Sequence, residues 1–375
     1  MKLLYAINSS FTEIEHYIKS GNEHPKTYMW WDYINQDPRY KLVFIENKKG
    51  GKLVRFLEIF LFLRTLQYQI DVIKRQNEYD AIFCSLDHFH VVIYLCRLFR
   101  ILKKPLFGIS HQSFNYKVST EKWFWKLRWY IYSKITIYGF DYLAFFSKNN
   151  LDKSLEVNNL PLRNRNIIVW GADVDFYDSY VSNFNVNYTE PYFMSIGSSN
   201  RDYNLLIDAF KENSFLLKIF QKFNSNLVNR DQIPSNVIFD QDSVSSGSLA
   251  RHQDLRKVYK ECYAVLIPLK KQLDILNGIT VLFEAIACGK PVVITDNVLM
   301  PFDVEVEGIG FKVKYGDKQG WIDAVNYLVT NPKKTKIMGE KAYELAKTKY
   351  NYNNYKEKLL NEFTTFSESF QTNSK

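Results

Sequence analysis

The chain has 375 residues, of which 46% are hydrophobic and 16% are aromatic. This length is enough for two domains of ordinary size, and this composition excludes a disordered protein. The formal net charge is +9, and the cysteines (Cys84, Cys96, Cys262 and Cys288) show neither paired nor metal-binding spacing. We therefore expect buried thiols in a reducing compartment and no disulfide framework.

Short apolar segments alternate with helical patterns along the first half of the chain. The segments typical of buried strands are Lys2–Ile7, Leu42–Ile45, Ala81–Ser85, Pro105–Ser110, Tyr142–Phe146 and Asn166–Val169. The spacing of apolar residues between them predicts helices at Val54–Ile73, Val91–Leu102 and Trp123–Ile135. This alternation predicts a parallel, doubly wound α/β sheet in an N-terminal Rossmann-like domain over residues 1–180.

The N-terminus and the apolar runs bear on the cellular location. The first apolar run ends at Asn8, so it predicts a strand rather than a signal peptide. No run approaches the length needed to cross a bilayer, because charges interrupt the longest one, residues 82–101. We therefore expect a cytoplasmic protein.

A basic and aromatic segment lies within the first half. Between residues 97 and 136, Lys or Arg occupies positions 97, 100, 103, 104, 117, 122, 126, 128 and 134, against Glu121 alone. Its centre interleaves cations with indole rings at Lys122, Trp123, Trp125, Lys126, Arg128 and Trp129. Such a segment suits the anionic inner face of the plasma membrane, where the protein would bind peripherally and meet its acceptor. An ordinary surface helix with inward-facing rings is the alternative, whereas nucleic acid is disfavoured because no accompanying motif is present.

Parallel strands resume in the second half. A polar, Asn-rich stretch over residues 179–190 is typical of a linker. The strands predicted after it are Tyr192–Ile196, Leu216–Phe220, Asn236–Phe239, Ala264–Pro268, Val292–Thr295 and Phe311–Val313. They indicate a second Rossmann-like domain over residues 181–348, followed by a helix near Tyr352–Phe366 within residues 349–375. Ligands of such sheets bind beyond the carboxyl ends of the strands, so we expect an active site in a cleft between the two domains.

The strongest functional motif runs from Asn277 to Val293. Gly278 permits close approach of a ligand, and the following amides of Ile279 and Thr280 have no intrahelical acceptors. These donors and the helix dipole suit a phosphate group. Glu284 follows about one and a half turns later, where a carboxylate can accept the hydroxyls of a ribose.

Four segments in register resemble the retaining glycosyltransferases of family 4, which have the GT-B fold. They are Val169–Tyr177, Met194–Tyr203, Glu284–Val292 and Glu307–Val313, and together with their surroundings they cover roughly residues 79–365. The resemblance implies two Rossmann-like domains facing a cleft and a nucleotide-sugar site in the second. It also implies that His111, which directly follows a predicted strand, contacts the donor sugar, although a purely structural histidine is the alternative. The final helix would then cross back to the first domain.

Two departures from the family pattern affect the donor site. The family's first Glu falls at Leu276, and Asp274 is a possible substitute. The family's Gly-Arg…Lys pair, which neutralises the diphosphate, is also altered: Ser198 follows Gly197, and Arg201 is the only cation before Asp202. We therefore assign the phosphate role to Arg201, with Lys270 and Lys271 in reserve. The donor-binding residues expected are Gly197, Ser198, Lys270, Asn277, Gly278, Ile279, Thr280 and Glu284, and the catalytic residues expected are His111 and Arg201.

The resemblance predicts a metal-independent hexosyltransferase without a cofactor. It would move a sugar from a UDP- or GDP-sugar, with UDP favoured, to a glycan or lipid-linked acceptor in envelope polysaccharide synthesis, with retention of configuration. Two alternatives stay open: a catalytically impaired GT-B scaffold that binds nucleotide sugars, motivated by Leu276, and a sugar-nucleotide epimerase. No acid–base carboxylates are evident at convincing positions for the epimerase.

Overall fold

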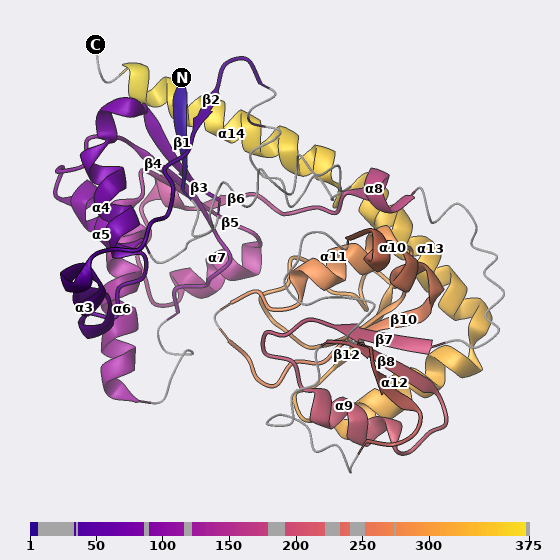
Figure 1. The fold of residues 1–375 in the computed structure, drawn as a ribbon. Coiled ribbons are helices and arrows are strands. Elements are labelled where there is room, and N and C mark those ends of the chain that lie inside the picture. The colour runs from indigo at the N-terminus through magenta and orange to yellow at the C-terminus, as the bar shows by residue number, and fades with distance from the viewer. Residues whose placement is uncertain are drawn as a thin grey trace. The chain divides into compact units, whose positions relative to one another are not determined.

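A computed structural model describes residues 1–6, 34, 37–85, 90–115, 122–178, 192–221, 233–240, 252–273 and 275–372. They form two compact units, each with a parallel sheet between helices (Figure 1). The first unit comprises the described residues up to Val169 together with Tyr355 and those that follow it. The second unit extends from Trp170 to Asn354. The linker predicted over residues 179–190 lies outside the described residues.

The sheet of the first unit has six parallel strands in the order β2-β1-β3-β4-β5-β6. The strands are β1 (Lys2–Ala6), β2 (Lys41–Val43), β3 (Ala81–Cys84), β4 (Leu106–Ser110), β5 (Tyr142–Phe145) and β6 (Asn166–Ile167). The helical elements are α3 (Lys52–Phe60), α4 (Leu66–Lys74), η2 (Gln76–Glu78), α5 (Val91–Leu98), α6 (Trp123–Gly139), α7 (Lys148–Leu155), η3 (Leu162–Asn164) and the greater part of α14 (Tyr352–Thr372). The six strands predicted in this half are therefore confirmed.

One helix predicted from the sequence is wrong. The apolar pattern over Val54–Ile73 predicts a continuous helix, but the structure has α3 and α4 separated by a short turn. Phe62 and Thr65 in this turn both have a φ of 50°, which no α-helix contains. The carboxylate of Glu58 accepts the amide of Leu66 at 2.7 Å and so holds the start of α4.

Alternate residues of the strands serve the two faces of the first sheet. On one face Ile82, Leu106 and Leu143 join a core completed by α4, α5 and α6. On the other face Phe107 packs edge-on against Phe363 of α14, with ring centroids 5.1 Å apart. Rings of Phe83 and Tyr142 also contact α14, at Phe363 and Phe366. The C-terminal helix therefore supplies one of the two apolar layers of the N-terminal sheet.

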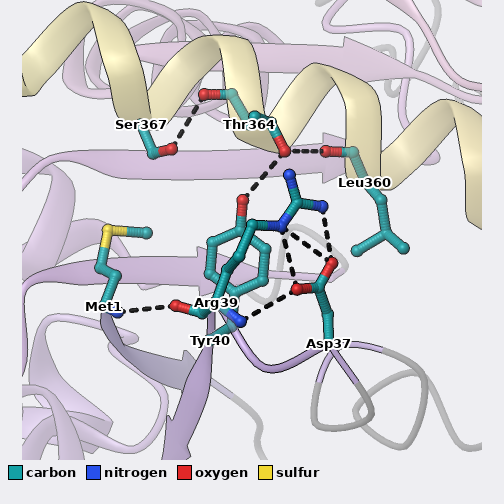
Figure 2. Close-up of polar contacts among 7 residues, drawn as sticks. All are labelled: Met1, Asp37, Arg39, Tyr40, Leu360, Thr364 and Ser367. Carbon is teal, nitrogen blue, oxygen red and sulfur yellow. Dashed lines mark hydrogen bonds and ion pairs between the residues drawn. The ribbon is translucent and has the colours of Figure 1, made fainter.

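Polar contacts fix the same helix beside the start of β2. The Tyr40 hydroxyl lies 3.0 Å from the hydroxyl of Thr364, and Figure 2 shows this pair beside the clamp formed by Asp37 and Arg39. Arg39 donates from Nη2 to Asp37 at 2.6 Å, and its carbonyl accepts the N-terminal amine of Met1. The first and last described segments of the chain thus belong to one unit.

The second sheet also has six parallel strands, in the order β12-β11-β10-β7-β8-β9. They are β7 (Tyr192–Ile196), β8 (Leu216–Phe220), β9 (Val237–Phe239), β10 (Cys262–Ile267), β11 (Val292–Thr295) and β12 (Gly310–Val313). The helices are α8 (Val174–Asp178), α9 (Tyr203–Phe210), α10 (His252–Glu261), α11 (Ile279–Ala287), α12 (Lys318–Thr330), α13 (Pro332–Thr348) and the first residues of α14. Helices α9 and α12 cover one face of this sheet, and α10, α11 and α13 lie on the other (Figure 1).

The order of the second sheet determines where a ligand site forms. The chain passes outward from β7 through β8 to β9 and then returns to add β10, β11 and β12 on the opposite side. The direction therefore reverses between β7 and β10, and connections leave their carboxyl ends toward opposite faces. Open α/β sheets bind ligands in the crevice at such a switch point.

Candidate functional site

The loops that follow β7 and β10 are joined to each other at the switch point of the second sheet. The amide of Lys270 donates to the carbonyl of Asn200 at 3.0 Å, and the amide of Asp202 donates to the carbonyl of Pro268 at 3.1 Å. Arg201 and Leu269 form an antiparallel bridge between these bonds. The two loops thus behave as one backbone framework, which carries several of the residues predicted to bind a donor.

Gly197 and Arg201 form a tight turn directly after β7. Gly197 has a φ of +110°, which favours glycine, and a Cβ atom there would lie 2.6 Å from Nη2 of Arg201 and would displace the guanidinium. The Arg201 guanidinium donates from Nε to the carbonyl of Ile196 at 3.1 Å and from Nη1 to that of Ser199 at 3.0 Å. Among the described residues no acceptor is found for Nη2.

Arg201 is also almost completely buried, with 7% of its surface exposed. Burial lowers the pKa of its guanidinium, and the nearby Tyr203 and Tyr259 oppose this effect. An arginine remains charged in this situation because its ordinary pKa is so high. A buried cation held by carbonyl oxygens is therefore present beside the carboxyl end of β7.

Helix α11 begins near the same loops. Its N-cap is Gly278, with a φ of +89° and a ψ of −6°, and a Cβ atom there would lie 2.8 Å from Cγ2 of Ile267 in β10. No side chain caps the helix, and among the described residues no acceptor is bonded to the amides of Gly278, Ile279 or Thr280. Gly278 and Thr280 are partly exposed. The positive end of the α11 dipole therefore retains free donors, as an anion site requires.

Asn277 connects the start of α11 to two neighbouring loops. Its Oδ1 accepts the hydroxyl of Ser199 at 3.1 Å, and its carbonyl accepts Nδ2 of Asn297, which follows β11, at 3.4 Å. The loops after β7, β10 and β11 are thus brought together around Asn277. Of the remaining predicted donor residues, Ser198 and Lys270 have exposed side chains on the first two of these loops.

Glu284 lies on α11 and is 6% exposed. Its Oε2 accepts the hydroxyl of Tyr259 on α10 at 2.7 Å. Tyr259 was not predicted as a site residue, because no local motif distinguishes it from a tyrosine that is buried for packing alone. The hydrogen bond orients the carboxylate that was predicted to hold a ribose.

The position at which the resemblance expects a first Glu has an apolar environment. Leu276 is 4% exposed, so its side chain belongs to the interior of the second unit. The alternative carboxylate, Asp274, lies outside the described residues. The described part of this loop therefore presents amides rather than a carboxylate beside α11.

His111 belongs to the first unit and directly follows β4, as predicted. It is partly buried, and the next residue, Gln112, donates its amide to Oγ of Ser110 at 3.1 Å. This local bond fixes the backbone on either side of His111. Its role toward a donor sugar stays a prediction.

The basic and aromatic segment forms the first half of α6, also in the first unit. Trp123 is 75% exposed, and Trp125 and Arg128 are exposed as well. Trp129 instead stacks on Tyr132, with ring centroids 4.8 Å apart, and packs against the core. Lys122 is exposed, whereas Lys126 is partly exposed. The start of α6 therefore packs the Trp129 ring against the core and exposes the other indole rings and the cations to solvent.

No helix in the described part of the chain has the length and apolar character needed to span a bilayer.

Part of the second unit is similar to a known protein family. The family described as "Glycosyl transferases group 1" matches residues 245–345, which include β10, α11 and β11. No curated protein sequence matches the chain. The family match thus covers the Gly278 turn and Glu284 but not the Gly197 turn.

Comparison with solved structures covers nearly the whole chain. HepE from Anabaena in complex with UDP-glucose has a TM-score of 0.67 and 15% identity, covering 97% of this chain and 100% of that one. Sucrose-phosphate synthase from Thermosynechococcus elongatus has a TM-score of 0.70 and 13% identity, covering 98% of this chain and 99% of that one. A structure from Listeria monocytogenes described as a "putative UDP-N-acetylglucosamine 2-epimerase" has a TM-score of 0.59 and 14% identity, covering 98% of this chain and 97% of that one. With the two parallel sheets, these likenesses establish the GT-B fold with two Rossmann-like domains.

Proposed function

We propose that the chain is a glycosyltransferase that moves a sugar from a nucleotide-diphosphate donor to an acceptor hydroxyl. The observation that supports this most is the uncapped start of α11 beside the buried Arg201, both at the switch point of the second sheet. Amides, a helix dipole and a guanidinium are suitable partners for a diphosphate. The match of residues 245–345 to group 1 glycosyltransferases, and a structural neighbour that binds UDP-glucose, favour a UDP-sugar.

In the proposed reaction, negative charge builds on the leaving diphosphate as its bond to the sugar breaks. The amides of Gly278–Thr280 and the guanidinium of Arg201 would stabilise that charge without a metal ion. Glu284 would accept hydrogen bonds from the ribose hydroxyls, oriented by Tyr259. His111 would contact the donor sugar, as the resemblance to family 4 implies. We further propose retention of configuration, with the leaving phosphate accepting the acceptor's proton.

The proposed acceptor is a glycan or lipid-linked saccharide of an envelope polysaccharide, reached from the cytoplasmic face of the plasma membrane. The exposed rings and cations at the start of α6 support this location, since such side chains suit an anionic interface. The location and the transfer reaction rest on different residues, so each can be tested without the other.

Incubation of the full chain with a panel of nucleotide sugars, with and without EDTA, tests the reaction. Slow release of free nucleotide and sugar that persists in EDTA is expected for a metal-independent transferase. Conversion to a different sugar nucleotide would instead identify an epimerase, and binding without turnover would identify a scaffold. An Arg201→Lys variant with unchanged hydrolysis would contradict the phosphate role of Arg201.

A further inference from the structure

Helix α3 presents an apolar face to solvent. Leu53, Phe56 and Phe60 recur at helical spacing and are 72%, 60% and 66% exposed, and Ile59 beside them is 77% exposed. No residue of α3 is buried. A surface helix ordinarily directs its apolar stripe toward the core, but in α3 only Val54 and Leu57 are partly buried and the other apolar side chains are exposed.

The exposed face continues into the turn that follows α3. Leu61 and Phe62 are 48% and 62% exposed. The ring of Phe62 meets that of Trp125 in α6 edge-on, with centroids 5.9 Å apart. The exposed apolar residues of α3 and α6 are thus neighbours through Phe62, although more than fifty residues of sequence separate them.

Arg128 of α6 fixes this junction. Its Nη2 donates to the carbonyl of Phe62 at 2.9 Å, and its guanidinium carbon lies 4.8 Å from the centre of the Phe62 ring. The same guanidinium lies 5.6 Å from the centre of the Trp125 ring. A cation placed over two exposed rings remains available to an anion while holding the two segments together.

Charge around this surface is predominantly positive. On the α3 side, Lys52, Arg55 and Arg64 are exposed. The acid of the helix, Glu58, is partly buried and accepts the Leu66 amide. On the α6 side, residues 122–139 contain no Asp or Glu. An apolar face bordered by cations is complementary to an anionic lipid surface, which offers both negative head groups and apolar acyl chains. A surface that is only acidic, or only apolar, would match one of these two features alone.

We propose that α3, the Leu61–Phe62 turn and the first half of α6 form one membrane-docking surface. In it α3 lies in the plane of an anionic bilayer and inserts its apolar face at the boundary between head groups and acyl chains, while the Lys and Arg side chains contact lipid phosphates. Interfacial helices of this kind bury their apolar face by about 5–10 Å. The inference deepens the peripheral location proposed above by assigning insertion to α3, and it does not depend on the transferase reaction.

Flotation of the full chain with phosphatidylcholine vesicles, with and without phosphatidylglycerol, tests the proposal. The triple variant Leu53→Ser, Phe56→Ser, Ile59→Ser retains every charge of the surface. Its partition onto anionic vesicles should fall at least about tenfold relative to the wild type. The matched control Leu162→Ser, Val306→Ser, Ile337→Ser removes equally exposed apolar side chains elsewhere and should bind as the wild type does (exposures 81%, 83% and 50%).

Three outcomes would overturn the proposal. The first is failure of the wild type to bind anionic vesicles at low salt, and the second is wild-type binding by the α3 variant. The third is a dimeric wild type together with an α3 variant that is monomeric and still binds vesicles. In that case α3 would form an interface with a second copy of the chain and would not contact the membrane. A second variant, Ile59→Ser with Phe60→Ser, should reproduce the loss at an unchanged melting temperature. Nucleotide-sugar hydrolysis measured without vesicles should remain normal in both, so failure of the reaction and failure of docking are separate results.

Discussion

The hydroxyl of Tyr259 donates a hydrogen bond of 2.7 Å to Oε2 of Glu284, and both side chains are buried in the second unit. Tyr259 lies on α10 and Glu284 on α11, so the bond connects two helices on the same face of the sheet. A carboxylate held in this way has a fixed orientation. In the proposed site, the bond from Tyr259 would orient Glu284 toward the hydroxyls of a ligand.

Removal of the Tyr259 hydroxyl should weaken nucleotide binding. Hydrogen bonds to charged groups contribute about 1.5–3 kcal/mol, so Tyr259→Phe should raise the Kd for UDP roughly tenfold or more. Glu284→Ala should raise it further, with kcat less affected than KM. Calorimetric titration measures the Kd. Tyr263→Phe is the matched control, because it removes a hydroxyl bonded to the carbonyl of Leu328 instead. Equal effects of the two Tyr variants would contradict an orienting role for Tyr259.

The backbone of Gly278 should not tolerate a side chain. Gly278→Ala introduces strain at a φ of +89° and places a methyl group 2.8 Å from Ile267, at the point where α11 begins. Gly316→Ala introduces similar strain at a φ of +73°, but nothing lies within 4 Å of the new methyl group. Gly316→Ala should lose about 1–2 kcal/mol of stability, and Gly278→Ala at least as much because of the added contact with Ile267. Donor binding should fall only in Gly278→Ala, and melting curves with nucleotide titrations measure the two effects. Equal nucleotide affinity in the two variants would exclude the α11 turn from the site.

Arg201 should contribute to turnover beyond its charge. Arg201→Lys retains a cation but loses the planar guanidinium, in which Nε and Nη1 bond the carbonyls of Ile196 and Ser199 and Nη2 remains as a separate donor. We expect turnover to fall on the order of a hundredfold, the usual effect of losing one preorganised donor. Lys270→Ala serves as the comparison, because Lys270 is an exposed cation on the adjoining loop. A greater loss in Lys270→Ala than in Arg201→Lys would transfer the phosphate role to Lys270.

Alkaline pH should destabilise the second unit. Burial raises the pKa of the Cys262 thiol to about 12, with Lys290 opposing the shift, and burial likewise raises the pKa of Tyr203 to about 12. Both folded values lie above the ordinary values of 9.0 and 10.0, so the unfolded chain releases these protons first. The associated stability is complete below about pH 9 and is lost as the pH rises toward 12.

Melting temperatures between about pH 8 and pH 11 measure this effect. Cys262→Ala removes one of the titrating groups and should show a shallower decline than the wild type, although its melting temperature at pH 8 should be lower because the thiol is packed. Parallel curves for the two proteins would show that Cys262 does not contribute to the alkaline transition.

Much of the fold could be predicted because the strands are short apolar runs with sharp ends. Tyr192–Ile196 follows Pro191 and precedes Gly197, and its predicted bounds are the observed ones. The break between α3 and α4 could not be predicted, because Leu61–Thr65 contains neither Gly nor Pro. There, Phe62 and Thr65 adopt left-handed conformations that their residue types disfavour, and tertiary contacts with Arg128 and α4 override local preference.

The candidate site was predictable to the extent that it depends on local backbone chemistry. Gly278 and Glu284 carry their signals within one short segment, and the structure places them at the start and middle of α11. The hydrogen bonds of Glu284 with Tyr259 and of Asn277 with Ser199 join residues 25 and 78 positions apart. No local pattern specifies such pairs, because they arise from the order of the strands.

The dependence of the N-terminal sheet on α14 has a consequence for biosynthesis. Phe83 and Phe107 emerge from the ribosome well before Phe363, which covers them and lies more than 250 residues later in the sequence. Since domains usually fold as they are synthesised, the later-encoded unit can complete its core first. Until α14 has been synthesised, one aromatic surface of the earlier unit stays bare, and a nascent chain stalled before α14 is a natural substrate for chaperones.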